Sequence, residues 1–299
     1  MKFLSIWEER PAHEFWNAHL LGNGRLGFSV YGTVPKEEIL VNDDTLWSGH
    51  EDYYVNPRHY EKFKEAQQLA LECKVKEANE VINNEMTGRW SEAYLPLGSI
   101  YLMTGQADNV RTMTLKTIVE APESAFTEYR RELDLSTAVE TVSYQKNGIR
   151  YDREYFVSKP REAGFIYLSA EDLSGQKEKP LCFAIGVDSK LHYENGANEE
   201  AAFLTGVAPS HAEPSYTPVA PMLIYEKESE SKDYRYGLVV KVLATDGETG
   251  TDYQRTYVRN ASYAILAVTA KTNFTGLHVP RNNDRTQLLE ELMAQTETL

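Results

Sequence analysis

The sequence predicts a mainly β protein built as a large antiparallel sandwich, and three observations favour this fold class. The chain has 299 residues with 19 Tyr and 10 Phe, and aromatic side chains are enriched in strands. Its short apolar runs alternate with polar residues at the period of two that a half-buried strand requires. These runs recur along the chain at intervals typical of sandwich folds. We therefore expect sheets, rather than helices, to form the core.

The clearest predicted element is a hairpin. Residues 138–144 lead through Asn147 and Gly148 into residues 149–157, and an Asn-Gly pair tolerates the positive φ angles of a tight turn. Residues 22–27, GNGRLG, come before their strand, so we interpret these glycines as a turn. Further strands are expected at residues 27–31, 38–41, 99–103, 164–170, 180–187, 236–244 and 262–270. Charged residues predict solvated loops at 194–200 and 226–233.

Two segments have helical periodicity. A helical insertion is expected at about residues 57–83, as two short helices, with Asn56 as the N-cap and Pro57 at the first position. In residues 285–299 a helix would place its apolar side chains on one face. Those side chains are Leu288, Leu289, Leu292 and Met293. The sequence shows no obvious partner for that face.

The composition argues against several classes of function. A formal net charge of −14 disfavours nucleic acid, because phosphate binding needs clustered Lys and Arg, and it equally disfavours an anionic membrane surface. No apolar run approaches the roughly 20 residues that span a bilayer. The apolar stretch at the N-terminus ends at Trp7 and is too short for a secretion signal. With only two cysteines, Cys73 and Cys182, a reducing cytoplasm is the expected location.

Known catalytic signatures are absent from the sequence. It contains no nucleophile elbow, phosphate-binding loop, dinucleotide motif or zinc-protease motif. The seven histidines have no metal-ligand spacing, so we expect neither a metal nor a cofactor. Asp43 and Asp44 are adjacent, and in an extended strand they would point to opposite faces. Glu132 and Asp152 lie beside arginines, and we interpret them as members of cross-strand ion pairs.

Residues 39–49, ILVNDDTLWSG, place an apolar strand directly before amides, carboxylates and an indole. Asn42, Asp44 and Trp47 are candidate sugar-binding residues, because Asn and Asp offer directional hydrogen bonds and Trp offers a flat apolar face. The alternative interpretation is an Asx-type turn after the strand, with Trp47 packed on the core. His211 and Tyr216 are further candidates for the same sugar site.

Six segments together resemble a known family. They are residues 18–27, 41–49, 94–100, 129–135, 151–158 and 204–211. In this order they resemble the N-terminal domain of glycoside hydrolase family 95, the family of inverting α-L-fucosidases and related α-L-galactosidases. Each segment alone is a weak signal, and their order over most of the chain carries the resemblance. Ser99 stands where the family often has an acidic residue, and residues 105–127 depart from its pattern.

The resemblance implies a β-super-sandwich at residues 1–284. Residues 285–299 would then begin a helical linker to an (α/α)6 catalytic barrel that is absent from this chain. Because the chemistry of the family lies in that barrel, the resemblance assigns no catalytic residue here, and we expect the chain alone to be inactive.

Three functions stay open at this point. The leading hypothesis is the non-catalytic N-terminal domain of an enzyme that acts on fucosylated or L-galactosylated glycans. Its expected partners are the barrel and the oligosaccharide substrate, with Asn42, Asp44, Trp47 and His211 as rim or interface residues. The alternatives are a free-standing carbohydrate-binding module and a purely structural interface domain, which would expose an apolar patch and self-associate.

Overall fold

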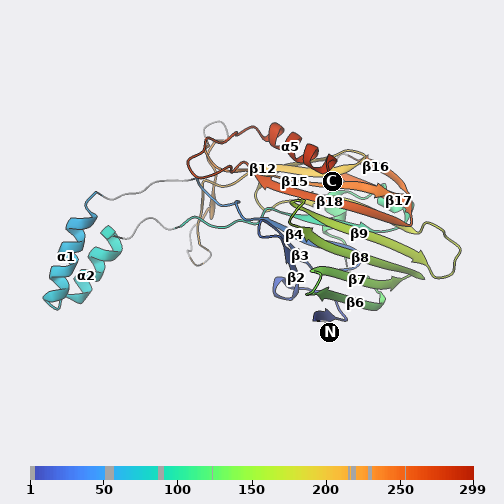
Figure 1. Ribbon diagram of the computed structural model, residues 1–299, viewed down its shortest axis with the longest axis horizontal. Helices are drawn as coiled ribbons and strands as arrows, with labels where there is room; N and C mark the ends of the chain where they lie inside the picture. The colour runs from blue at the N-terminus through green and yellow to red at the C-terminus, as the bar shows by residue number, and fades with distance from the viewer. Residues whose placement is uncertain are drawn as a thin grey trace.

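Two large β-sheets face each other in the computed structural model (Figure 1), which describes residues 4–50, 57–86, 91–122, 124–214, 216, 220–227, 231–252 and 254–299. The nine-stranded sheet has the order β1-β6-β7-β8-β9-β18-β15-β12-β11, and the seven-stranded sheet has the order β16-β17-β10-β5-β4-β3-β2. Neighbouring strands in both sheets pair antiparallel. The predicted fold class, mainly β with large antiparallel sheets, is confirmed.

The strands of the nine-stranded sheet are β1 (Ser5–Glu8), β6 (Thr127–Asp134), β7 (Val139–Lys146), β8 (Ile149–Ser158), β9 (Ala163–Asp172), β18 (Tyr263–Thr272), β15 (Arg235–Thr245), β12 (Ala201–Val207) and β11 (His192–Ala197). Those of the seven-stranded sheet are β16 (Glu248–Asp252), β17 (Arg255–Ala261), β10 (Leu181–Asp188), β5 (Gly98–Thr104), β4 (Lys36–Asp43), β3 (Leu26–Val30) and β2 (His19–Gly22). A small third sheet pairs β13 (His211–Ala212) with β14 (Leu223–Ile224). The helices are α1 (His59–Leu71), α2 (Val75–Val81), α3 (Ala107–Val110), α4 (Leu115–Val119) and α5 (Arg285–Glu297), with a 3-10 turn at Phe15–Asn17 and a π turn at Ile82–Met86.

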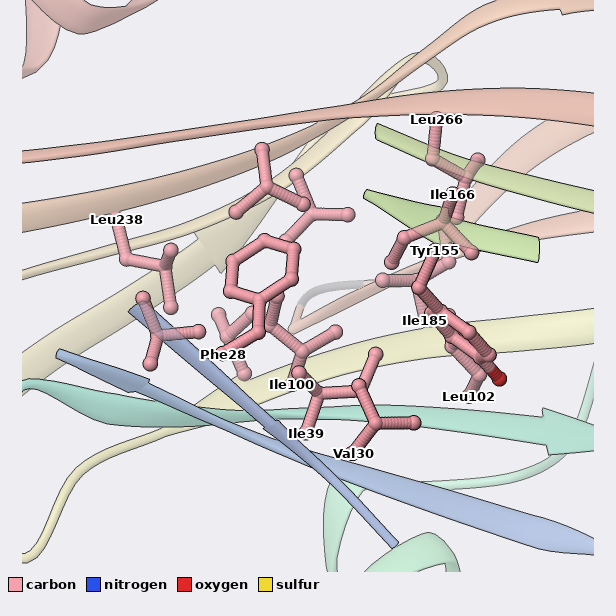
Figure 2. Packing of buried hydrophobic residues seen from close by; sticks show 14 of the residues in the cluster. Phe28, Val30, Ile39, Ile100, Leu102, Tyr155, Ile166, Ile185, Leu238 and Leu266 are labelled. Atoms are coloured by element: carbon pink, nitrogen blue, oxygen red, sulfur yellow. The ribbon is translucent and has the colours of Figure 1, made fainter. Parts of the chain in front are cut away.

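The main core fills the space between the two sheets (Figure 2). Phe28, Ile39 and Ile100 point inward from the seven-stranded sheet, towards Ile166 and Leu266 of the nine-stranded sheet. Alternate residues along each strand face this core because successive side chains of a strand point to opposite faces. Burial of apolar surface between the sheets is therefore the main stabilising contribution.

Every predicted strand is present, and the Asn147-Gly148 hairpin joins β7 to β8. The expected solvated loop at residues 194–200 is wrong in its first part. Residues 194–197 belong to β11, an edge strand that pairs only with β12 in its sheet. Its polar side chains are compatible with a strand because an edge strand has one neighbour and keeps water contact. The chain also contains strands that were not predicted from the sequence, namely β1, β2, β6, β12, β13, β14, β16 and β17.

The predicted ion pairs form along strands rather than between them. Arg130 lies 2.7 Å from Glu132, and Arg150 lies 3.0 Å from Asp152. Residues two apart share a face of the sheet, so the charges meet within β6 and within β8. The expectation of cross-strand pairs at these carboxylates is corrected accordingly.

Helix α5 covers the outer face of the nine-stranded sheet, which corrects the expectation that its apolar face has no obvious partner. Leu292 is fully buried in a cluster with Ala201 and Val239. A Cβ built on Gly237 would lie 2.7 Å from Leu292, so the sheet needs a glycine where the helix approaches. Asp284 caps the helix by accepting a hydrogen bond from the Thr286 N–H at 2.8 Å.

Helices α3 and α4 cover the outer face of the seven-stranded sheet. Val110 and Ile118 pack there against Cys182 and Ala184 of β10. Residues 181–187 are consequently buried on both faces, which explains why this strand reads as a continuous apolar run. The segment that departs from the family pattern therefore supplies a helical cover for the sheet.

Helices α1 and α2 form the predicted helical insertion. Figure 1 shows this hairpin extending away from the sandwich. The helices begin at His59 and Val75, while the expected N-cap Asn56 lies outside the described residues. Ala66 and Ala78 are the buried residues of these two helices. Large side chains such as Tyr60, Phe63 and Leu71 are exposed.

A buried polar link joins the two sheets inside the sandwich. Arg153 of β8 lies 2.9 Å from the Glu37 carboxylate of β4 and also donates to the Tyr144 hydroxyl at 2.8 Å. Glu37 also accepts from the Gly32 N–H at 2.8 Å and from the Tyr155 hydroxyl at 3.2 Å. Burial raises the pKa of the Glu37 carboxyl to about 7, while the neighbouring Arg153 opposes that rise.

Candidate functional site

The strand β4 ends in the predicted Asx turn. The Asp43 side chain accepts a hydrogen bond from the Thr45 N–H at 2.9 Å and another from the Thr45 hydroxyl. Leu46 then inserts fully into the core, whereas Trp47 is 40% exposed. The turn forms as the alternative interpretation expected. The expectation that Trp47 packs on the core is wrong. Leu46 occupies that position and leaves the indole at the surface.

Trp47 forms an aromatic pair with Tyr94. Their ring centroids lie 5.4 Å apart, and the two residues form an isolated antiparallel bridge. The indole N–H donates to the backbone carbonyl of Asp44 at 3.0 Å, so the single donor of this side chain is already used. Tyr94 is 47% exposed. The pair therefore presents an apolar aromatic face to solvent.

Asn42 and Asp44 flank this pair in different ways. The Asn42 amide donates to the Leu95 carbonyl at 3.4 Å and bonds with the Tyr94 side chain. Asp44 is exposed, and partial burial together with the nearby Asp43 carboxylate raises the pKa of its carboxyl. Asn42 thus orients the aromatic face, and Asp44 adds a negative charge beside it.

His211 lies between two carboxylates. Its Nδ1 is 3.2 Å from Glu92 and its Nε2 is 3.3 Å from Glu213. The hydrogen bond with Glu92 raises the pKa of this imidazole, and the charge of Glu213 adds to the effect. Glu92 also accepts a hydrogen bond from the Ser48 hydroxyl. His211 is thereby connected to the turn that presents Trp47.

Backbone contacts hold the three segments together. The Gly49 N–H donates to the Pro209 carbonyl at 2.8 Å, and the Ser48 N–H donates to the Ala93 carbonyl at 2.9 Å. Gly49 has a φ of +69°, and a Cβ there would lie 3.0 Å from Glu92, so both the conformation and the space require glycine. Residues near 47, 92 and 210 therefore form one surface, which we call the Trp47–His211 surface.

Three of its members were not predicted from the sequence. They are Glu92, Tyr94 and Glu213. Tyr94 is the first residue of one of the family-like segments, residues 94–100. A contact between that segment and residues 41–49 could therefore have been considered from the sequence. The two glutamates carry no sequence signal. Glu92 meets His211 across more than a hundred residues of chain, and Glu213 meets it because of a local turn of the fold. Tyr216, a further candidate, is exposed.

The Trp47–His211 surface has the chemistry of a contact surface. Both nitrogens of His211 face carboxylates, and the indole N–H is used internally. Hollows of about 460 and 890 Å³ on the described surface are lined by other residues. Within the described residues, no group of three or more His, Cys, Asp or Glu side chains is arranged to hold a metal ion. An exposed aromatic pair beside acidic groups suits a partner surface or the flat face of a sugar.

Comparison with known proteins identifies the fold family. The sequence profile described as glycosyl hydrolase family 65, N-terminal domain, matches residues 6–277. The chain belongs to this family. The predicted identity as a glycoside hydrolase N-terminal domain is confirmed, although the matching profile carries the number 65 where the six sequence segments resemble family 95.

One curated protein and one solved structure are also similar to this chain. The chain is 27% identical over 276 residues to alpha-L-fucosidase 2 of Arabidopsis thaliana, a match that covers 89% of this chain and 30% of that protein. It therefore spans about a third of the length of that curated relative. A human-microbiome protein provisionally named a kojibiose phosphorylase has a solved structure that matches 98% of this chain and 35% of its own, with 9% identity and a TM-score of 0.47.

No helix among the described residues is long and apolar enough to cross a membrane. Both cysteines are free: Cys73 is at the surface, and Cys182 is buried in β10 beneath the helical cover.

Proposed function

We propose that this chain is the non-catalytic N-terminal domain of an α-L-fucosidase-like glycoside hydrolase that acts in the cytoplasm on fucosylated or L-galactosylated glycans. The observation that carries the proposal is the match of most of this chain to only 30% of an alpha-L-fucosidase. The catalytic residues then belong to a separate helical domain of the same polypeptide. The free cysteines fit a reducing compartment.

The Trp47–His211 surface is the part of the domain that we propose to face the catalytic domain or the rim of its substrate site. It combines an exposed aromatic pair with charged side chains, as the centre and edge of protein interfaces do. Aromatic residues at such positions supply most of the binding free energy. On this proposal Trp47 and Tyr94 are the central contacts, and Asp44 lies at the edge.

Activity assays test the proposal directly. We expect the purified chain to release no product from an aryl α-L-fucoside or from an α-1,2-fucosylated oligosaccharide. We expect the polypeptide translated through the reading frame beyond Leu299 to hydrolyse at least one of them. Turnover by the chain alone would overturn the non-catalytic role, and an extended polypeptide that cleaves neither substrate would overturn the fucosidase assignment.

A free-standing carbohydrate-binding module is the second candidate function, favoured by the exposed ring pair of Trp47 and Tyr94 beside Asp44. Calorimetric titration with fucose, galactose and their oligosaccharides separates the two functions. A module would bind at millimolar concentration and lose binding in Trp47→Ala. The absence of heat at that concentration removes this candidate.

A further inference from the structure

A hollow of about 890 Å³ opens at the end of the sandwich opposite the Trp47–His211 surface. Strand β4 runs from Lys36 to Asp43, and Pro35 just before it lines the hollow, whereas the Trp47 turn follows its far end. Strand β5 runs from Gly98, near Tyr94, to Thr104, which lines the hollow. The two sites are therefore separated by the length of these strands, about 25 Å for eight residues.

The walls of the hollow come from both sheets and from the helical cover. Met103 and Cys182 line it from the seven-stranded sheet, Ile149 and Tyr151 from the β7–β8 hairpin, and Met113 from the segment between α3 and α4. A volume of this size lies in the range of small-molecule sites, about 300–1,000 Å³. Thioether side chains adapt to the shape of an apolar ligand. The hollow thus offers an apolar wall wide enough for a ring.

The charged residues at its rim are Lys146, Lys177, Glu178 and Lys179. Lys179 is neutralised by Asp246 at 3.3 Å. The Lys146 ammonium donates to the Ser124 hydroxyl at 2.7 Å and has no carboxylate partner among the described residues. Lys177 uses its backbone N–H to bind the Asp172 carboxylate, while its side chain makes no ion pair within the described part of the chain.

The sign of the charge among the residues that line the hollow is opposite to that of the net charge of the whole chain. The chain carries a formal net charge of −14, yet lysines outnumber carboxylates around the hollow. Burial, together with the nearby Arg153, lowers the pKa of Lys146. The amides of Asn147, Asn260 and Gln106 add neutral hydrogen-bonding groups at the rim.

We propose that this hollow binds a small organic anion, a phosphate or carboxylate group carried on an apolar ring. The anionic group pairs with Lys146 and Lys177, and the ring packs against Met103, Met113 and Tyr151. The lining of this hollow is mixed, with apolar side chains on one part and amides and lysines on another, and a few placed polar groups are how small-ligand sites gain orientation. The site is independent of the glycan that the proposed enzyme cleaves, and of whether the enzyme is a fucosidase.

Methionine-methyl NMR of the full chain locates the ligand. Phenyl phosphate is the probe, with benzyl alcohol and inorganic phosphate as the neutral and ring-free comparisons. We expect phenyl phosphate to shift the methyl signals of Met103 and Met113 saturably at millimolar concentration or below, and to leave those of Met222 and Met293 in place. Added salt should weaken the binding because it screens the ammonium groups.

Charge removal supplies the matched control. We expect Lys146→Gln with Lys177→Gln to weaken phenyl phosphate binding by about tenfold or more, and Lys190→Gln with Lys232→Gln, which removes the same charge elsewhere, to leave it unchanged. Unaltered Met222 and Met293 signals verify that both variants are folded. The proposal is overturned if Met103 and Met113 do not respond, if either comparison compound binds as tightly as phenyl phosphate, or if both double variants bind equally.

Discussion

His211 shows how one side chain connects distant segments of this chain. Its imidazole lies between Glu92 and Glu213, and Glu92 in turn accepts from Ser48 beside Trp47. When the imidazole is protonated, both contacts become charge-assisted and strengthen. The order of the Trp47–His211 surface should therefore depend on pH through this residue.

His211→Asn should destabilise the protein at mildly acidic pH and have little effect at alkaline pH. The folded state raises the pKa of His211 above its usual 6.5. Its contribution to the free energy of unfolding is therefore complete below pH 6.5 and is lost as the pH rises through the raised pKa. A pair at the surface contributes at most about 1 kcal/mol.

Urea unfolding of the wild type and the variant between pH 5.5 and pH 9 measures this difference, in the range where glutamates stay ionised. His278→Asn is the control, because that histidine is exposed and makes no ion pair with a carboxylate in the described part of the chain. A difference that grows with rising pH would contradict the assignment of His211 as the protonated partner.

Gly164 is required by close packing rather than by backbone conformation. A Cβ at this position of β9 would lie 2.1 Å from the Phe28 ring of the opposite sheet. We expect Gly164→Ala to lower the free energy of unfolding by about 1–3 kcal/mol, the usual effect of overpacking.

Denaturant unfolding of three variants checks this packing. Gly27→Ala is the matched control, because its nearest contact, at 3.8 Å, leaves room for a methyl group. Adding Phe28→Leu to Gly164→Ala should cost less than the sum of the two single changes, since the smaller side chain gives the methyl group space. Strict additivity would count against a direct clash.

At the scale of elements, the two sheets of the sandwich are joined to each other by polar as well as apolar contacts. The Glu37–Arg153 pair connects β4 to β8, and His19 of β2 lies 2.7 Å from Glu140 of β7. All four side chains are almost completely buried. A buried charged or polar group is costly when it is left unpaired, so these contacts favour one position of each sheet against the other.

Arg153→Met should destabilise the protein by about 3–5 kcal/mol, the usual cost of leaving a buried charge without its partner. Without the guanidinium, the pKa of Glu37 rises further above its present value of about 7. An acid whose pKa is raised in the folded state loses stability as pH increases through that pKa. The loss should consequently be larger at pH 8 than at pH 6.

Chemical unfolding at these two pH values is the measurement. Arg150→Met, in the same strand and paired with Asp152 at the surface, is the control and should cost less than about 1 kcal/mol. Equal costs for the two arginines would refute the role of Arg153 as a link between the sheets.

At the scale of the whole molecule, the sandwich and the α1–α2 hairpin are stabilised to different degrees. Helices α1 and α5 both have 13 residues. Helix α5 buries Leu288 and Leu292 on the sheet, whereas α1 buries only Ala66. Short helices without tertiary packing are marginally stable in water, so the fold gives these two helices different environments despite their equal length.

Hydrogen exchange followed by mass spectrometry should show this difference. We expect the amides of α1 to exchange much faster than those of α5, because opening of α1 exposes little apolar surface. Helix α5 serves as the length-matched reference within the same sample. Equal protection of the two helices at low protein concentration would contradict the exposed state of the hairpin.

The sequence determined much of this protein by itself. Alternating apolar residues predicted many of the strands, Asn147-Gly148 predicted the hairpin, and the polar residues after residues 39–41 were compatible with an Asx-type turn, because each depends on neighbours in the chain. Edge strand β11 was mistaken for a loop because its polar residues fit either state. Helices α3 and α4 were not predicted, since they are short and are stabilised by packing on β10.

Only the tertiary structure decided which side chains contact one another. It placed Leu46 rather than Trp47 in the core, gave α5 its sheet, and brought Glu92 beside His211 and Arg153 beside Glu37. These contacts join residues far apart in the chain, and no local pattern encodes them. Local sequence thus determines which elements form, while burial in the assembled sandwich determines which side chains meet and which remain available to a partner.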